Sequence, residues 1–330
     1  MALYLFHKHL ANSAVAALLV TTLAACGAGT EEESAGNLSD LYDGNVSEAT
    51  LTPNNADDLS TDVYTGGEAS ESIGGGVLRS AAAGGDHSSR TLKIIQFAQD
   101  TIDSLGLSDP TRSLTRNEVS ETEQFEGSCG GGATLSITFD DETGEFGGSI
   151  TFDDFCEDNE ITSGEIMFSG TLDPDTVEFD SFTMVFDSLT VTSNNESFTT
   201  TGELAVSSTG STTHTEMDII FEDNLTGQAV WFENFTIDTT ASEIGGFTEI
   251  SIAGRYYDWV HGFVTVTTVS PLRVMGSDEW PSAGEYILEG DSSSAHIEVL
   301  SNTTFQLSVD EDGDGNYDYT EALLWEDFEA

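Results

Sequence analysis

The sequence is short of positive charge. It contains 8 lysine and arginine residues against 60 aspartate and glutamate residues, which gives a formal net charge of −52 over 330 residues. A chain with this balance is repelled by nucleic acids and by anionic membrane surfaces, so no nucleic-acid partner is expected. The acidic residues are spread along the whole chain, which favours adaptation to a saline or calcium-containing exterior over one specific cationic partner.

Sequence motifs for catalysis are also missing. Past residue 25, no histidine belongs to an H-E-x-x-H pair, and the chain has no G-x-S-x-G elbow, phosphate-binding loop or C-x-x-C. Carboxylate pairs that hydrolyse glycosides can be drawn almost anywhere among 60 acids, so they carry no information. We therefore expect a non-enzymatic protein with a binding or structural role. The alternative is a secreted-type hydrolase that acts on an envelope or extracellular polymer. The histidines past residue 25 are His87, His214, His261 and His296.

One short stretch concentrates aromatic residues beside a rare cation. Residues 255–259 read Arg-Tyr-Tyr-Asp-Trp. Such a group can stack on a sugar or line a ligand surface, so a hydrophobic or glycan ligand is a candidate partner. The pattern favours the simpler interpretation, a strand packed on both faces with Arg255 in an ion pair, and Arg273 is interpreted in the same way. Three tryptophans are expected to pack in the core or at its edge: Trp231, Trp280 and Trp325.

Cysteine is scarce, and the first of the three follows a secretory signal. Lys8 is followed by an uncharged, mostly apolar run over residues 11–22, which is too short to span a bilayer. Residues 23–27 read Leu-Ala-Ala-Cys-Gly. This arrangement resembles the bacterial lipobox. The alternative is an ordinary signal peptide with an incidental cysteine.

The resemblance to the lipobox covers residues 1–26 and implies where the protein resides. Residues 1–25 would be removed as a lipoprotein signal peptide, and Cys26 would become the lipidated amino terminus. Several acyl chains on one cysteine hold a protein firmly to a membrane. Gly27 follows, and not the Asp that resembles an inner-membrane retention signal, so the resemblance implies the outer membrane of the cell envelope without indicating the leaflet.

The chain after the lipobox is polar, with one exception. Residues 26–89 are rich in Gly, Ser, Thr, Asn, Asp and Glu, and their apolar residues are isolated, so we predict a disordered acidic tether. Residues 91–105 differ, because Leu92, Ile95, Ile102 and Leu105 follow helical spacing. We predict one amphipathic helix packed on a sheet there. A helix lying on a membrane surface is the alternative.

The remaining chain predicts β-structure. Apolar residues alternate with polar ones in many short runs from residue 125 to residue 328, for example over residues 135–139 and 182–186, with turn signals between the runs. Helical patterns do not interleave with these runs, so parallel units are not expected. We predict an all-β domain over residues 90–330. Its fold is a long antiparallel meander forming a barrel-like wrap or a two-layer sandwich, with one N-terminal amphipathic helix.

The two remaining cysteines, Cys129 and Cys156, are placed by the register of one expected hairpin. Pairing Phe139 with Phe146 across the turn at residues 140–144 puts apolar residues opposite one another, and their numbers add to 285. The numbers of the two cysteines add to the same value, so they meet at the open end of the hairpin. An exported protein retains such a disulfide. Gly130, Gly131 and Gly132 can shift this register. A redox role is the alternative, and the absence of basic residues beside either thiol disfavours it.

The most informative stretch of the body is an acidic loop near the C-terminus. Residues 310–321 match the calcium-loop pattern D-x-[DN]-x-[DN]-G-x5-E at every specified position. The loop resembles those of EF-hand proteins and related bacterial extracellular calcium proteins. It lacks a second loop, and its entering segment is strand-like, so we expect a structural Ca²⁺ site rather than a sensor. The alternative is an acidic surface turn. The predicted ligands are Asp310, Asp312, Asp314, Asn316, Asp318 and Glu321.

Overall fold

The computed structural model contains one large antiparallel sheet. It describes residues 37–64, 119–140, 143–157, 159–172, 179–193, 196–242, 246–276, 278 and 280–325. Each of the fourteen strands is paired with its neighbours in sequence, and the sheet is not closed. The strands are β1 (Val119–Glu126), β2 (Gly130–Phe139), β3 (Glu145–Glu157), β4 (Glu160–Leu172), β5 (Phe179–Ser193), β6 (Glu196–Thr209), β7 (Thr212–Asp223), β8 (Gln228–Ala241), β9 (Phe247–Asp258), β10 (Gly262–Met275), β11 (Ala283–Gly290), β12 (Ser293–Ser301), β13 (Thr304–Asp310) and β14 (Tyr319–Leu324).

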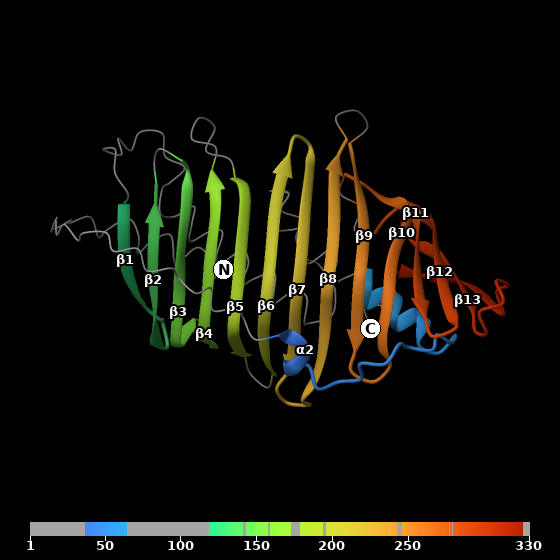
Figure 1. The fold of residues 1–330 in the computed structure, drawn as a ribbon, viewed down its shortest axis with the longest axis horizontal. Helices are drawn as coiled ribbons and strands as arrows, with labels where there is room; N and C mark the ends of the chain where they lie inside the picture. The colour runs from blue at the N-terminus through green and yellow to red at the C-terminus, as the bar shows by residue number, and fades with distance from the viewer. Residues whose placement is uncertain are drawn as a thin grey trace.

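The strands form because their apolar residues recur at every second position. In β5, for example, Phe182, Met184 and Phe186 are buried, while the residues between them are partly exposed. Side chains of a strand alternate between the two faces of the sheet, so this pattern gives one apolar face, called here the core face, and one outer face. The prediction of an all-β antiparallel meander is confirmed. The sheet is an open wrap, with β1 at one end and β14 at the other (Figure 1).

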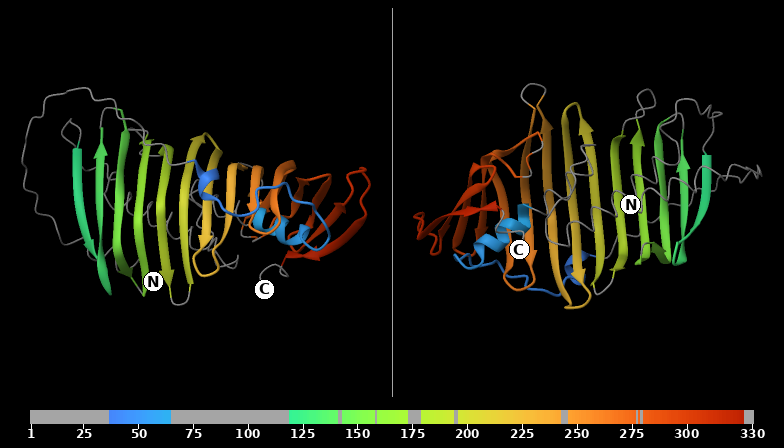
Figure 2. Two further views of the ribbon diagram at one scale, coloured as in Figure 1. Left: turned by 60° about the horizontal axis from the view of Figure 1, so that its bottom comes forward. Right: turned by 180° about the vertical axis from the view of Figure 1, so that it is seen from behind.

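The sheet twists along its length. The long strands β3 to β10 stand side by side, whereas β11 to β14 are shorter and are turned away from them (Figures 1 and 2). Two glycines allow backbones to approach closely where the register shifts. A Cβ atom on Gly202 would lie 2.1 Å from the Asp218 carbonyl oxygen, and one on Gly254 would lie 2.6 Å from the Phe235 Cα. Both glycines have φ near +130° (132° and 136°), which side-chain-bearing residues rarely adopt. These bulges bend the strands.

Residues 37–64 belong to the folded body. They begin with α2 (Leu38–Leu41) and end with helical residues 56–64. Leu51 and Leu59 are buried in the same core as the sheet residues, with exposed fractions of 0% and 1%. The Leu51 amide donates to Ser293 Oγ at 2.8 Å, and the Tyr286 hydroxyl donates to the Ser60 carbonyl at 3.0 Å.

The predicted disordered tether over residues 26–89 is therefore wrong for residues 37–64. The prediction failed because the apolar residues of this segment are isolated in sequence and do not pack against one another. Their partners lie more than 190 residues away in β9, β11 and β12, and those partners supply the burial that offsets the ordering entropy.

The segment 37–64, called here the strap, crosses from one face of the sheet to the other. Tyr42 packs in a small cluster on the outer face with Leu38, Trp231 and Tyr257. Helical residues 56–64 cover the core face near β9 to β14, where Tyr64 contacts two tryptophan rings. Between these two parts the strap runs along one edge of the sheet (Figures 1 and 2).

Several predictions fall outside the described residues. They are the signal peptide over residues 1–25, the lipidated Cys26, the helix over residues 91–105 and the tether at residues 26–36 and 65–89. Within the part of the chain that the structure describes, no helix has the length and apolar character needed to cross a bilayer.

Candidate metal site

The acidic loop connects the last two strands. The β13–β14 ladder ends where Val309 pairs with Tyr319, and the Asp318 amide donates to the Val309 carbonyl at 2.8 Å. The chain between these residues has to reverse direction and carry its carboxylates on a tight turn. Gly313 and Gly315 adopt φ of 70° and 85°, a conformation that favours glycine.

Three carboxylates converge inside this loop. One ligand oxygen from each of Asp310, Asp312 and Asp314 lies within 4.8 Å of the other two. Asp310 is buried at the end of β13, with 4% of its surface exposed, while the other two are exposed. Placing three carboxylates this close costs electrostatic free energy, and a divalent cation would offset that cost.

Backbone amides hold the carboxylates in place. Asp310 accepts hydrogen bonds from the amides of Gly313 and Gly315, both at 2.8 Å. Asp312 accepts one from the Asp314 amide at 3.2 Å, and Asp314 accepts one from the Asn316 amide at 2.8 Å. These bonds orient the side chains in advance, so binding a cation there would not require ordering the loop.

Asp318 and Glu321 lie outside this group of three, and the Asn316 side-chain amide donates to Asp314 at 2.9 Å. Asp318 accepts a hydrogen bond from the Glu311 amide at 3.0 Å. Glu321 lies within β14, opposite Leu307, and accepts a hydrogen bond from the Tyr319 hydroxyl. In an EF-hand the last ligand is a bidentate glutamate at loop position 12. Here the residues that follow the loop form a strand, β14. A strand rises about 3.3 Å per residue, so Glu321 lies farther along the β13–β14 ladder than Tyr319, the residue at its end.

The loop also rests on the turn between β11 and β12. A Cβ atom on Gly313 would lie 2.9 Å from the Ser292 carbonyl oxygen, and the Tyr317 ring stacks on His296, with ring centroids 6.0 Å apart. The neighbouring Asp291 amide donates to the Ala49 carbonyl of the strap at 2.7 Å. The acidic loop therefore contacts the β11–β12 turn, and that turn contacts the strap.

The predicted disulfide is present at the opposite end of the sheet. Cys129 and Cys156 are bonded, with Cα atoms 5.1 Å apart. The hairpin register is the predicted one, with Phe139 opposite Phe146. The register shifts within Gly130–Gly132, so that Gly130 and not Cys129 pairs with Cys156 in the ladder.

The aromatic stretch at residues 255–259 is packed rather than open. Tyr256 is buried in the core, and its hydroxyl donates to Asp62 at 3.0 Å. Tyr257 stacks on Trp231 at 4.5 Å. Arg255 forms an ion pair with Glu233 at 3.0 Å, as the simpler interpretation predicted. Arg273 forms one with Glu249 at 2.7 Å, and Trp231, Trp280 and Trp325 are all buried.

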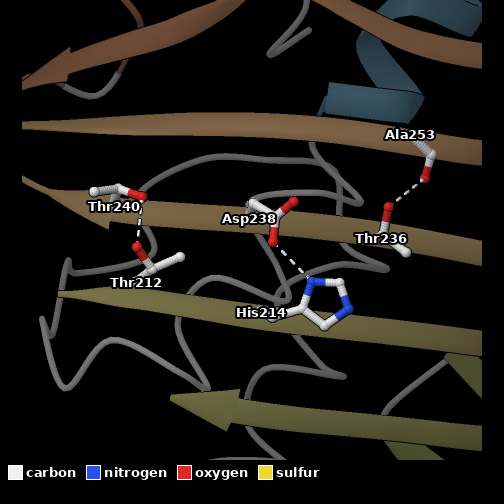
Figure 3. Close-up of polar contacts among 6 residues, drawn as sticks. All are labelled: Thr212, His214, Thr236, Asp238, Thr240 and Ala253. Carbon is white, nitrogen blue, oxygen red and sulfur yellow. Dashed lines mark hydrogen bonds and ion pairs between the residues drawn. The ribbon is translucent and has the colours of Figure 1, made fainter. Parts of the chain in front are cut away.

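One histidine pairs with an acid across two strands of the outer face. His214 Nδ1 lies 2.7 Å from Asp238 Oδ1, between β7 and β8, and both side chains are about half exposed. Threonine hydroxyl contacts flank this pair, including Thr212 with Thr240 at 3.0 Å (Figure 3). The pair is a cross-strand contact that stabilises neighbouring strands modestly.

The sequence reasoning missed Asp62, whose side chain is solvent-exposed but whose carboxylate accepts a hydrogen bond from the buried Tyr256 hydroxyl. Desolvation of the carboxylate, the largest cause, together with the nearby Asp258 and Asp58 raises its pKa to about 6, against the lowering effect of the hydrogen bond from Tyr256. A signal for its helix was present, because Leu59 and Val63 lie four residues apart, and the Asn55 side chain accepts from the Thr52 amide just before the helix.

Comparisons with known proteins leave the family open. No protein-family model matches the chain, and no curated protein matches it in sequence. The site must therefore be interpreted from its own geometry.

Proposed function

We propose that this chain is an envelope-anchored lipoprotein whose β body is stabilised by a structural Ca²⁺ ion and has a non-enzymatic binding or structural role. The observation that carries the proposal is the convergence of Asp310, Asp312 and Asp314 within 4.8 Å in a preorganised loop. The net charge of −52 supports it, because each bound divalent cation reduces the repulsion within the body.

The chemistry of the ligands favours calcium. All three groups are carboxylates, which are hard oxygen ligands, and the group contains no imidazole or thiolate. Calcium takes six to eight oxygens in flexible geometry and accepts water and backbone carbonyls to complete its shell, whereas magnesium demands a near-ideal octahedron. Sites in extracellular modules bind calcium with a Kd of roughly 10⁻⁴–10⁻³ M, so a partial protein shell suffices outside the cell.

A cation in this loop would stabilise more than the loop. It would hold β14, the last strand of the sheet, against β13 at the point where their ladder ends. The loop contacts the β11–β12 turn through Gly313 and Ser292, and that turn holds the strap at Ala49. A bound ion that is absent from the unfolded state adds its binding free energy to the stability of the fold.

The calcium proposal is tested by thermal unfolding with Ca²⁺ and with a chelator. The chelator should lower the melting temperature of the wild type, and Asp312→Ala combined with Asp314→Ala should abolish the difference. The matched control is Glu311→Ala, which removes an exposed acid of the same loop that lies outside the group of three. This variant should still show a lower melting temperature when the chelator is added. Wild-type curves that coincide with and without Ca²⁺ would remove the proposal.

The anchor is tested separately by mass spectrometry of the mature protein. We expect an amino-terminal Cys26 with a mass increase corresponding to acyl chains. An unmodified amino terminus at another residue would contradict the anchor and leave the calcium site untouched. The alternative of a hydrolase, and the prediction of a hydrophobic or glycan ligand, remain predictions.

A further inference from the structure

One edge of the sheet collects features that are far apart in the sequence. In an antiparallel meander, every second connection lies at the same end of the strands. This edge, called here the turn edge, carries the β7–β8, β9–β10, β11–β12 and β13–β14 connections, and therefore the acidic loop. The strap runs along it between α2 and Leu51 (Figure 1).

Backbone contacts fix the strap to the turn edge. The Asn45 amide donates to the Trp259 carbonyl at 3.1 Å, and the Ala49 amide donates to the Phe263 carbonyl at 2.8 Å. The α2 helix lies beside the β7–β8 turn, because Leu38 packs with Ile220 of β7. The first described residues of the chain are therefore part of this edge.

The turn edge exposes large apolar side chains. Leu225 at the tip of the β7–β8 turn is 65% exposed, and Val260 at the tip of the β9–β10 turn is 60% exposed. On the strap beside them, Val46 is 59% exposed and Leu41 is 56% exposed. These are the four most exposed large apolar side chains among the described residues, and all four lie over β7 to β10. Gathered exposed apolar residues indicate an interaction surface, whereas scattered ones do not.

The position of the anchor indicates what this surface meets. Eleven residue steps separate Cys26 from Asn37, which precedes α2. Even a fully extended chain of that length reaches only about 40 Å. The turn edge is thus the edge that a lipid at Cys26 would hold near the bilayer. The other edge lies one strand length away, about 45 Å for strands of 14 residues.

The charge of the edge restricts the lipid. Asp40 and Asp43 lie on the strap, and Asp223 and Asp258 flank the two exposed turns. No lysine or arginine lies in the strap or in these two turns, and their only histidine is His261 of the β9–β10 turn. An anionic membrane surface would repel this edge, whereas a zwitterionic one would not.

We infer that the turn edge over β7 to β10 rests on a zwitterionic bilayer surface, with Leu41, Val46, Leu225 and Val260 inserted at its interface. This inference depends on the proposed anchor at Cys26. Docking would hold the sheet upright, with its strands pointing away from the membrane and the acidic loop beside the headgroups.

The test is depth-dependent quenching in reconstituted vesicles. The full mature protein is bound to phosphatidylcholine vesicles that contain a lipid with a quencher near the headgroup. A fluorophore is attached at Leu225→Cys or, as the control, at Ser211→Cys in the β6–β7 turn of the opposite edge. Cys129 and Cys156 are bonded, and Cys26 is to be acylated, so the introduced thiol is the only one to label. We expect severalfold stronger quenching at Leu225→Cys.

Two further variants show whether the exposed apolar side chains are responsible for the quenching. With a fluorophore at Val46→Cys, the double change Leu225→Ser and Val260→Ser should lower quenching by at least half. The matched control Leu300→Ser, which removes a 49% exposed leucine next to the β12–β13 turn at the opposite edge, should leave quenching unchanged.

The outcomes separate this inference from the anchor. Equal quenching at Leu225→Cys and Ser211→Cys in protein shown by mass spectrometry to be acylated overturns the docking and leaves the anchor intact. A disulfide-linked dimer through Leu225→Cys, without quenching, shows that the edge meets a second copy and also overturns the docking. An unacylated Cys26 in the mass spectrum overturns the anchor itself and, with it, the inference.

Discussion

The Tyr256 hydroxyl donates a hydrogen bond to the Asp62 carboxylate at 3.0 Å, and this contact joins the helical residues 56–64 to β9. Desolvation of the carboxylate at this contact raises the pKa of Asp62 from 3.8 to about 6. Because the folded pKa lies above the unfolded one, the folded state binds the proton more tightly. The charged carboxylate therefore costs stability above about pH 6, and that stability is recovered as the pH falls towards 4.

We predict that Asp62→Asn stabilises the protein at pH 8 and has little effect at pH 4. The rise of the pKa from 3.8 to about 6 sets an upper bound, and because the Asp62 side chain is solvent-exposed, screening should reduce the effect to about 1 kcal/mol or less. Urea unfolding at pH 4, 6 and 8 measures the difference from the wild type, with Glu289→Gln on the exposed side of β11 as the control for the general loss of charge. A difference that stays constant with pH would show that Asp62 titrates normally.

The strap is predicted to contribute strongly to stability. Leu59 is 1% exposed and packs in the core, so Leu59→Ala should lower the free energy of unfolding by about 2–5 kcal/mol. Leu41→Ala, in the same segment but 56% exposed, should change it by about 0.5 kcal/mol or less. Chemical denaturation measures both. Equal, small effects would mean that the strap is not part of the cooperative unit.

The disulfide is predicted to stabilise the β1–β3 end of the sheet. Cys129 and Cys156 are separated by 27 residues, and closing a loop of that length stabilises by roughly 3–4 kcal/mol in the chain-entropy model. A reductant should therefore lower the melting temperature of the wild type. The double variant Cys129→Ser and Cys156→Ser should melt at the lower temperature whether reductant is present or not. A wild type unaffected by complete reduction contradicts this.

Gly202 is predicted to tolerate no side chain. A Cβ atom there would lie 2.1 Å from the Asp218 carbonyl, and φ is 132°, so Gly202→Ala should destabilise by about 1–3 kcal/mol or more. Gly147→Ala in β3 is the matched control, because its Cβ would lie 3.5 Å from the nearest atom, the Phe168 carbonyl oxygen, which is ordinary contact. If the melting curves of the two variants coincide, the backbone at the bulge beside Gly202 adapts to the added side chain.

How much of this fold could be predicted depended on the range of the interactions. The hairpin carrying Leu135 and Ile150 was predictable in register, because alternation and a short turn determine local pairing. The disulfide followed from that register. The register shift at Gly130–Gly132 was predicted only as a possibility, because glycines allow such a shift.

Long-range features could not be predicted in the same way. Leu51 and Leu59 look like isolated apolar residues until β11 and β12 are folded beside them. The twist of this open sheet is the sum of small rotations and bulges over fourteen strands. At the metal site, the spacing identified the three converging aspartates. It did not show that Glu321 lies in a strand, because the pattern specifies residue types and not the geometry of the exit.

Calorimetric titration of the purified protein with Ca²⁺ tests the central claim most directly. We expect one site per chain that involves Asp310, Asp312 and Asp314, with a Kd of about 10⁻³ M or tighter, and no heat of binding at that site after Asp312→Ala with Asp314→Ala. Wild-type titration heats that are indistinguishable from those of the double variant would contradict the account.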